Sequence, residues 1–180
     1  MKIYTRKGDK GKTGLFNGER VDKDNIRIEC NGELDEVNSN IGLLRAKLPQ
    51  NHSWQAQLQT IQTEIMNLMS TIAHPQQTEG EEQPANSQKV GALEQWMETI
   101  QKKLGDKMNA LILPGGNEVS AMCHIIRTKI RRAERKVISL HRHSPLPEDL
   151  LAYINRLSDL FFMLALEEMK NNDVEEDKYL

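Results

Sequence analysis

The helical periodicity of the apolar residues limits the fold of this chain more than any other feature. From about residue 33 onward, apolar side chains recur every three or four residues in five successive stretches. The apolar residues of the first stretch are Leu34, Val37, Ile41, Leu44 and Leu48. Pro49 ends that stretch, and no alternating strand pattern is evident anywhere. The chain is therefore predicted to be all-α, with a five-helix bundle.

Residues between these stretches predict where the helices begin and end. Residues 74–86 form a polar loop between the second and third helices. Ser87 is a candidate N-cap for the third helix, and Gly105 would end it. Asn117 is a candidate N-cap for a long fourth helix, and the fifth begins near Pro147. Five helices in this order predict an antiparallel, ferritin-like up-down topology.

The length of the chain predicts a single domain, residues 1–180. A chain of 180 residues can bury a substantial core but is too short to divide comfortably into two domains. Residues 1–32 hold five glycines and many charges, and they are predicted to form an irregular glycine-rich arm. Residues 33–171 form the predicted bundle, and residues 172–180 form an acidic tail.

The distribution of charge is more informative than its sum. The net charge of −2 argues against a protein that binds nucleic acids in general. Cations nevertheless gather in two places, residues 1–12 and residues 127–136. Two local basic clusters in a mildly acidic protein indicate a small polyanion as ligand. On charge alone, two solvated surface patches explain the pattern equally well.

Several other classes of protein are disfavoured. Cys30 and Cys123 lie far apart without metal-ligand spacing, which is typical of free thiols in a reducing compartment. No apolar run approaches about 18 residues and no signal-like segment follows Met1, so the protein is predicted to be cytoplasmic and to contact no membrane. No carboxylate pair has the Glu-x-x-His spacing of di-iron bundles, so no metal held by the protein itself is expected.

The N-terminal arm, from Thr5 to Gly14, combines glycines with lysines, arginine and threonines. Glycines let backbone amides approach phosphate oxygens, while the cations neutralise them. The run Gly11-Lys12-Thr13 is similar to the end of a P-loop, but the first glycine of that motif would fall at Arg6. A Walker-type site is therefore not predicted. A phosphate-binding arm and a disordered basic leader remain equally good interpretations.

The fourth helix carries the second basic cluster. Arg127, Arg131 and Glu134 share a face that flanks the apolar stripe. An arginine pair at the edge of the core can bind a triphosphate, and Glu134 can orient an arginine or hold a water of a metal ion. Arg132 is predicted to lie nearer the solvent side. The commoner outcome for such a run is a solvated, salt-bridged helix face.

Polar residues also interrupt the apolar pattern of the fifth helix. They are Asn155, Arg156, Ser158 and Asp159. Asn155 can bind a sugar hydroxyl or an adenine edge, or it can form a hydrogen bond with a polar group of a neighbouring helix. Asp35 and Glu36 are predicted in the first turn of the first helix, where the helix dipole favours acids.

Taken together, these segments resemble the PduO-type ATP:cob(I)alamin adenosyltransferases. Four blocks carry the resemblance in the order found in that family. They are residues 3–11 with 18–24, residues 31–38 with 41–42, residues 113–116, and residues 127–135 with 155–159. Each block is short, but Arg-Arg-Ala-Glu-Arg, Asn-Arg-Leu-Ser-Asp and the arm are jointly specific in this order. The blocks span nearly the whole chain.

The resemblance implies a homotrimer with active sites between neighbouring subunits, each binding ATP with Mg²⁺ on its phosphates. The arm residues implied to bind ATP are Thr5, Arg6, Lys7, Gly8, Thr13 and Lys23. The helix residues implied to complete that site are Arg131, Glu134, Arg135 and Asn155. Asp35 and Arg127 would pair across the subunit interface. Arg127, Arg131 and Glu134 would carry the catalytic role.

The implied reaction is an alkyl transfer. The cobalt of cob(I)alamin attacks C5′ of ATP, a Co–C bond forms, and triphosphate leaves. Because cobalt is the nucleophile, the protein has to align the reactants and stabilise charge on the leaving group. A flavin reductase and an adenosylcobalamin-dependent enzyme are the implied protein partners. The alternatives are a chaperone that delivers adenosylcobalamin and a trimer that binds ATP with little turnover.

The sequence departs from the family pattern at two places. Leu111 stands where Phe is common in the family's Phe-x-Leu-Pro-Gly-Gly block, on the corrinoid side of the site. Leucine is smaller, so it would exclude the lower axial ligand of cobalt less completely. Arg6-Lys7 stands where Lys-Thr is common, a change that keeps positive charge in the arm.

Overall fold

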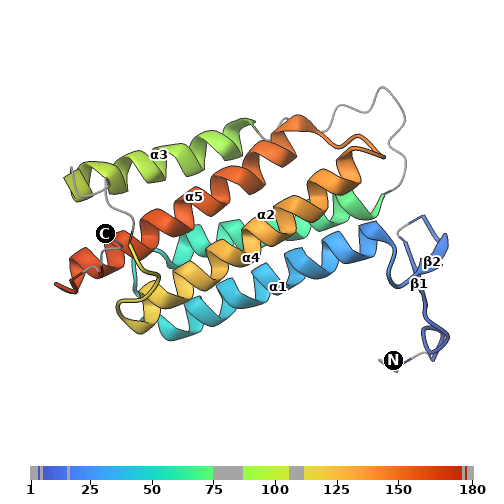
Figure 1. Ribbon diagram of the computed structural model, residues 1–180, viewed down its shortest axis with the longest axis horizontal. Helices are drawn as coiled ribbons and strands as arrows, with labels where there is room; N and C mark the ends of the chain where they lie inside the picture. Colours follow the sequence, from blue (N-terminus) through green and yellow to red (C-terminus); the bar gives the residue numbers. More distant parts are fainter. Residues whose placement is uncertain are drawn as a thin grey trace.

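The chain folds as a bundle of five helices with a small hairpin at its N-terminal end (Figure 1). The computed structural model describes residues 4, 6–15, 17–74, 87–105, 112–175 and 177. The helices are α1 (Ile26–Lys47), α2 (Gln55–Ala73), α3 (Ser87–Leu104), α4 (Glu118–His141) and α5 (Glu148–Asn171). The strands are β1 (Lys12–Gly14) and β2 (Arg20–Asp22). The predicted five-helix bundle is confirmed. No described helix combines the length and apolar character that a membrane span requires.

The helices lie side by side along the long axis of the molecule (Figure 1). α4 packs between α1 and α5, while α2 packs on α1 and α3 packs on α5. The apolar stripes seen in the sequence form one continuous core, in which Ile41, Ile65 and Phe161 are completely buried. Burying each such side chain contributes roughly 1.5–3 kcal/mol, so the stripes hold the bundle together.

Capping residues fix the helix ends that were predicted from the sequence. The side chain of Asn117 accepts a hydrogen bond from the amide of Ser120 at 2.8 Å, as an N-cap does. Gly105 follows α3 with a φ of +65°, a conformation that suits glycine. α5 begins directly after Pro147. The predicted polar loop lies outside the described residues, apart from His74.

The first helix begins earlier than predicted. Asn25 caps it, accepting a hydrogen bond from the amide of Arg27 at 3.0 Å, and α1 starts at Ile26 rather than near residue 33. The prediction that Asp35 and Glu36 lie in the first turn is therefore wrong, because both lie in the middle of α1. The helix dipole therefore does not explain why acids stand at these two positions, and both carboxylates are available for other contacts.

The N-terminal arm contains a hairpin that the sequence did not predict. β1 and β2 pair antiparallel, with Thr13 opposite Val21. Gly18 makes the turn with a φ of +84°. Each strand has only three residues, which is too short for an alternating pattern to be recognised. In Figure 1 the arm projects beyond the end of α1 that begins the bundle.

Candidate active site

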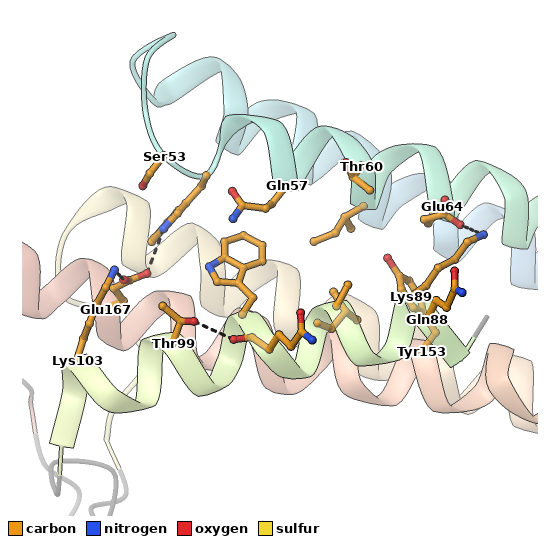
Figure 2. A pocket seen from close by; sticks show the side chains of 16 residues that line it. Ser53, Gln57, Thr60, Glu64, Gln88, Lys89, Thr99, Lys103, Tyr153 and Glu167 are labelled. Carbon is orange, nitrogen blue, oxygen red and sulfur yellow. Dashed lines mark hydrogen bonds and ion pairs between the residues drawn. The ribbon is translucent and has the colours of Figure 1, made fainter. Parts of the chain in front are cut away.

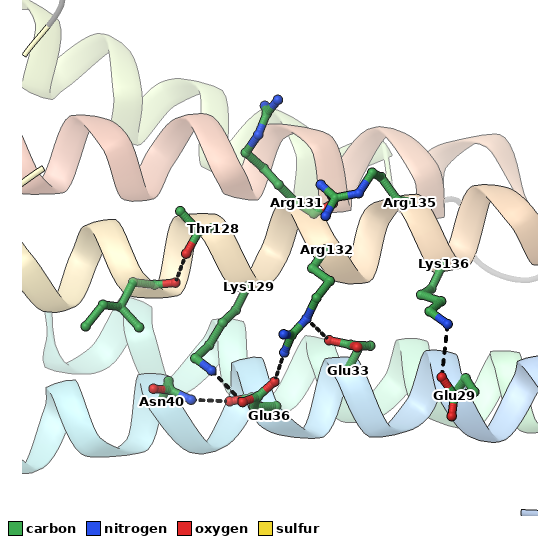
Figure 3. A network of polar contacts seen from close by, with 11 residues as sticks. Glu29, Glu33, Glu36, Asn40, Thr128, Lys129, Arg131, Arg132, Arg135 and Lys136 are labelled. Carbon is green, nitrogen blue, oxygen red and sulfur yellow. Dashed lines mark hydrogen bonds and ion pairs between the residues drawn. The ribbon is translucent and has the colours of Figure 1, made fainter. Parts of the chain in front are cut away.

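One row of cations on α4 is paired with carboxylates on α1 (Figure 3). This paired row consists of Lys129, Arg132 and Lys136. Arg132 donates to Glu33 at 2.6 Å and also contacts Glu36, which Lys129 contacts in turn. Lys136 donates to Glu29 at 3.0 Å. Arg132 is exposed, as predicted, but its charge is neutralised within the chain.

These contacts shift the pKa values of the paired groups in the expected directions. The hydrogen bond from Lys129 lowers the pKa of Glu36, and the nearby charges of Lys129 and Arg132 lower it further. The hydrogen bond to Glu33 raises the pKa of Arg132, and the one to Glu29 raises the pKa of Lys136. This side of α4 is therefore a salt-bridged seam between two helices, with no spare charge for a ligand.

A second row of cations lies on the side of α4 that faces away from α1. This unpaired row consists of Arg127, Arg131 and Arg135. Figure 3 shows Arg131 and Arg135 pointing away from the carboxylates of α1. Among the described residues, none of the three guanidinium groups forms an ion pair. Arg135 donates to the backbone oxygen of Arg131 at 3.0 Å. Like charges four residues apart on a helix cost about 0.2–0.5 kcal/mol per pair, so the row favours an external anion.

Arg127 is the least hydrated member of the unpaired row. Its guanidinium carbon lies 5.8 Å from the ring centre of Phe162 on α5, and its Nε is buried without a hydrogen-bond partner among the described residues. Burial lowers its pKa, and the charge of Arg131 lowers it further. A charge held in an apolar surrounding interacts more strongly with an anion than a charge in water does.

Glu134 and Asn155 join α4 to α5 next to the unpaired row. The amide of Asn155 donates to Oε1 of Glu134 at 2.9 Å. Both residues line a pocket of about 330 Å³ between the two helices, the α4–α5 pocket, whose walls include Val137 and Leu151. An apolar pocket with a few polar groups at its edge suits a planar, partly polar ligand of the size of a nucleobase.

The arm brings only some of its predicted residues together. Gly8 lies against Lys23, so that a Cβ atom at Gly8 would stand 3.5 Å from the Lys23 ammonium nitrogen. Arg20 holds this loop by donating to the backbone oxygens of Lys7 at 2.7 Å and Lys12 at 3.1 Å. Sequence reasoning missed Arg20, because its partners are backbone atoms that only the hairpin brings near.

Three further arm residues were predicted to bind a ligand. Thr13 lies within β1, and Arg6 adopts a φ of +57°, a left-handed conformation that is unusual for a residue with a side chain. Thr5 lies outside the described residues. Among the described residues before α1, from 4 to 23, no side chain forms a hydrogen bond or ion pair with α4 or α5, so this part of the arm and the unpaired row do not meet through such contacts in one chain.

Comparisons with known proteins agree on the family. A family model described as cobalamin adenosyltransferase matches residues 3–168. The chain belongs to the cobalamin adenosyltransferase family. The corrinoid adenosyltransferase of Bacillus subtilis is 40% identical over 168 residues, which cover 92% of this chain and 85% of the relative. The human corrinoid adenosyltransferase is 36% identical over 169 residues, covering 91% of this chain and 67% of the relative.

Solved structures of the family also match closely. A variant of the PduO-type ATP:corrinoid adenosyltransferase from Lactobacillus reuteri, complexed with cobalamin and ATP, superposes with a TM-score of 0.92. It is 30% identical to this chain, and the match covers 99% of each chain. A second variant of that enzyme, complexed with ATP, superposes with a TM-score of 0.89 at 29% identity. The resemblance inferred from the four sequence blocks is confirmed.

The turn before α4, which belongs to a family block, is fixed against the end of α5. Asn117 donates to Glu168 at 2.8 Å, and a Cβ atom at Gly116 would approach the side chain of Met169 to 3.0 Å. Only glycine fits there without a shift, and its φ of +84° also favours glycine. Leu111, the departure from the family pattern, lies outside the described residues.

Two buried polar residues of α4 beside this region were not singled out as ligands. The hydroxyl of Ser120 and both ring nitrogens of His124 have no hydrogen-bond partner among the described residues. Burial lowers the pKa of His124, and the charge of Arg127 lowers it further, so the imidazole is neutral at pH 7. The ring of His124 lies 6.0 Å from that of Phe162, the ring that Arg127 also approaches.

The cysteines supply no nucleophile. Cys30 and Cys123 are buried free thiols. Burial raises the pKa of Cys30 to about 11 and raises that of Cys123 as well. Both thiols are therefore protonated at neutral pH, and thiolate chemistry is not available to the site.

Proposed function

We propose that this protein transfers the 5′-deoxyadenosyl group of ATP to the cobalt of cob(I)alamin, giving adenosylcobalamin and triphosphate. The observation that carries this proposal is the unpaired row of Arg127, Arg131 and Arg135 beside the Glu134–Asn155 pair. The row offers positive charge that no described carboxylate neutralises. Membership of the cobalamin adenosyltransferase family gives this charge a specific use.

The reaction needs a site that stabilises its leaving group. As cobalt attacks C5′, the C5′–O bond breaks and negative charge grows on the departing triphosphate. Arg131 and Arg135 are exposed and within reach of a ligand, and a guanidinium group can bind two phosphate oxygens at once. Removing one preorganised donor of this kind typically costs about 10²–10³ in rate, so these arginines can supply a large part of the catalysis.

The other end of the nucleotide requires different groups. The α4–α5 pocket has apolar walls, and Asn155 stands at its edge with an amide that can serve a sugar hydroxyl or a base edge. Glu134 accepts the hydrogen bond that orients Asn155. We propose that ribose and adenine occupy this side while the phosphates reach the unpaired row.

We also propose that Mg²⁺ accompanies ATP, held mainly by the phosphates. Glu134 fits this role, because its second carboxylate oxygen has no hydrogen-bond partner among the described residues. When bound, Mg²⁺ would neutralise part of the triphosphate charge. Glu134 would accept a hydrogen bond from a water of the ion while keeping Asn155 in place.

A homotrimer would complete the site. The described part of the arm projects past the end of the bundle in Figure 1, which supports a site in which a neighbouring subunit would bring its arm to the unpaired row. Lys7, Gly8 and Lys23 of such an arm, held by Arg20, would bind the phosphates from the other side. Asp35 is exposed on α1, where it can pair with Arg127 of a neighbouring subunit.

We propose the following cellular setting. The whole chain would work as one domain in the cytoplasm, with residues 1–32 as the ATP-binding arm, 33–171 as the bundle and 172–180 as an acidic tail. The helical part begins before residue 33, because α1 starts at Ile26. A flavin reductase would supply the electron that forms cob(I)alamin, and an adenosylcobalamin-dependent enzyme would receive the product.

One assay tests the proposed function. Chemically reduced cobalamin and Mg-ATP are mixed with the protein, and the corrinoid spectrum and the released triphosphate are measured together. We expect adenosylcobalamin and triphosphate in equal amounts. Binding of ATP without formation of a Co–C bond would contradict the proposal and would favour a chaperone or a nucleotide-binding trimer.

A further inference from the structure

A second and larger pocket lies on another side of α5. It has a volume of about 530 Å³ and opens between α2 and α3, with α5 behind it (Figure 2). Among the described residues, α2 packs mainly on α1 and α3 packs mainly on α5, and the pocket lies between α2 and α3. Figure 2 shows Gln57 and Thr60 on α2 across this α2–α3 pocket from Thr99 on α3.

Polar contacts tie the two walls together at both ends of the pocket. At one end Lys89 on α3 forms an ion pair with Glu64 on α2. At the other end Glu167 on α5 accepts from Lys103 at 2.6 Å and from the indole of Trp54 at 3.1 Å. Glu167 is only 2% exposed, so the carboxylate that joins the walls at this end is buried. The pocket is therefore preformed, as ligand pockets usually are.

The chemistry of the walls restricts what can bind. Trp96 and Tyr153 offer aromatic surface, and the remaining polar wall groups are mostly neutral amides and hydroxyls, such as Gln57, Gln95 and Thr99. The four charged groups are already paired with one another, so the pocket offers no net charge to an ionic ligand. Aromatic faces with neutral polar groups at the edge suit planar rings that carry hydrogen-bonding substituents.

We propose that the α2–α3 pocket is a binding site for a neutral, planar, amphiphilic small molecule of one to three fused or linked rings. The rings would stack on Trp96, and their polar edge would meet the amides and hydroxyls of α2 and α3. The site is independent of the proposed adenosyl transfer. Tyr153 faces this pocket and Asn155 faces the α4–α5 pocket, because residues two apart on a helix point about 200° apart.

The chain carries its own reporter for this site. It has two tryptophans, Trp54 and Trp96, and both line the α2–α3 pocket. The neutral naphthalene dye 6-propionyl-2-(dimethylamino)naphthalene is a suitable probe, because it accepts excitation energy from tryptophan and has the proposed size and polarity. We expect saturable binding of one dye per chain, with quenching of tryptophan emission and sensitised emission of the dye.

Variants on both walls separate this site from unspecific dye binding. Ala92→Phe on α3 and Thr60→Phe on α2 place a ring in the pocket, and each should weaken binding at least tenfold. Gln101→Phe adds the same ring to an exposed position of α3 outside the pocket and should change the affinity less than twofold. Thermal unfolding followed by circular dichroism identifies any variant that does not fold. Because the two variants lie on different helices, one of them still tests the proposal if the other does not fold.

Three results would overturn the proposal. The first is the absence of saturable binding, which would mean that the pocket holds only water. The second is equal affinity for the anionic dye 8-anilinonaphthalene-1-sulfonate, which we expect to bind at least tenfold more weakly. The third is loss of dye binding whenever sedimentation shows an oligomer, the proposed homotrimer included, because the α2–α3 pocket would then be covered by another copy of the chain.

Discussion

The two rows of cations on α4 differ in their partners, although they lie on one helix and within ten residues of each other in sequence. The paired row is neutralised by Glu29, Glu33 and Glu36 on α1. The unpaired row has no carboxylate partner among the described residues. The first row joins α4 to α1, and the second is the row that we propose binds the triphosphate of ATP.

Arg131→Ala should have the largest effect on catalysis. It removes the central cation of the unpaired row, so kcat should fall by about 10²–10³. The rate of adenosylcobalamin formation, followed by the absorbance of the corrinoid, measures the loss. Arg132→Ala on the paired row is the matched control and should change kcat less than about threefold. Similar losses in both variants would remove the distinction between the rows.

Exchanging the charges of Asp35 and Arg127 tests whether the unpaired row also contacts a neighbouring subunit. Asp35→Arg or Arg127→Asp alone would oppose like charges across the proposed interface, and trimer association should weaken at least about tenfold. The double variant should recover most of that loss. Sedimentation velocity measures the oligomer, and circular dichroism checks the fold. Dissociation of both single variants without recovery in the double variant would argue against this pair.

Asn155→Ala should have a moderate effect, confined to nucleotide binding. Loss of a hydrogen bond to a neutral sugar or base group costs about 0.5–1.5 kcal/mol, and we expect KM for ATP to rise by up to tenfold with a smaller change in kcat. Asn171→Ala, an exposed asparagine on the same helix, is the control. If Asn155→Ala lowers the Tm but leaves KM unchanged, Asn155 serves only to join α5 to α4.

Glu36→Gln should have the smallest effect on activity and a pH-dependent effect on stability. The pKa of Glu36 is lower in the folded protein, because Lys129 donates to it and Arg132 lies near. The contribution of Glu36 to the stability of the fold is present above the pKa of an unfolded glutamate, about 4.3. It is lost as the pH falls through the lower pKa that Glu36 has in the folded protein. The variant should thus have a lower Tm than wild type at about pH 7 and the same Tm as wild type at about pH 2. A constant difference in Tm across that range would contradict the paired row.

Much of the fold could be predicted because it depends on local patterns. Apolar spacing gave the five helices, and Asn117 and Gly105 were recognised as ends from their types alone. The start of α1 was missed because polar residues in its first two turns weaken the apolar stripe, while Asn25 was not recognised as the cap. The hairpin was missed because each strand has only three residues.

The site was less predictable, since it depends on contacts between distant residues. Spacing correctly placed Arg131 and Glu134 on one side of α4. The salt-bridged interpretation of the basic cluster applies to the side toward α1. Binding of a triphosphate by the arginines on the other side, which form no ion pair among the described residues, stays a prediction. The sequence could not distinguish them, because Lys129 meets Glu36 across 93 residues of chain.

The most direct test of the central claim is the affinity of inorganic triphosphate for the two rows. Isothermal titration calorimetry with wild type, Arg131→Ala and Arg132→Ala measures it without cobalamin or turnover. We expect Arg131→Ala to weaken binding at least about tenfold, in line with the loss of one charge-assisted contact, and Arg132→Ala to change it less than about twofold. Equal weakening in both variants, or none in Arg131→Ala, would contradict the account.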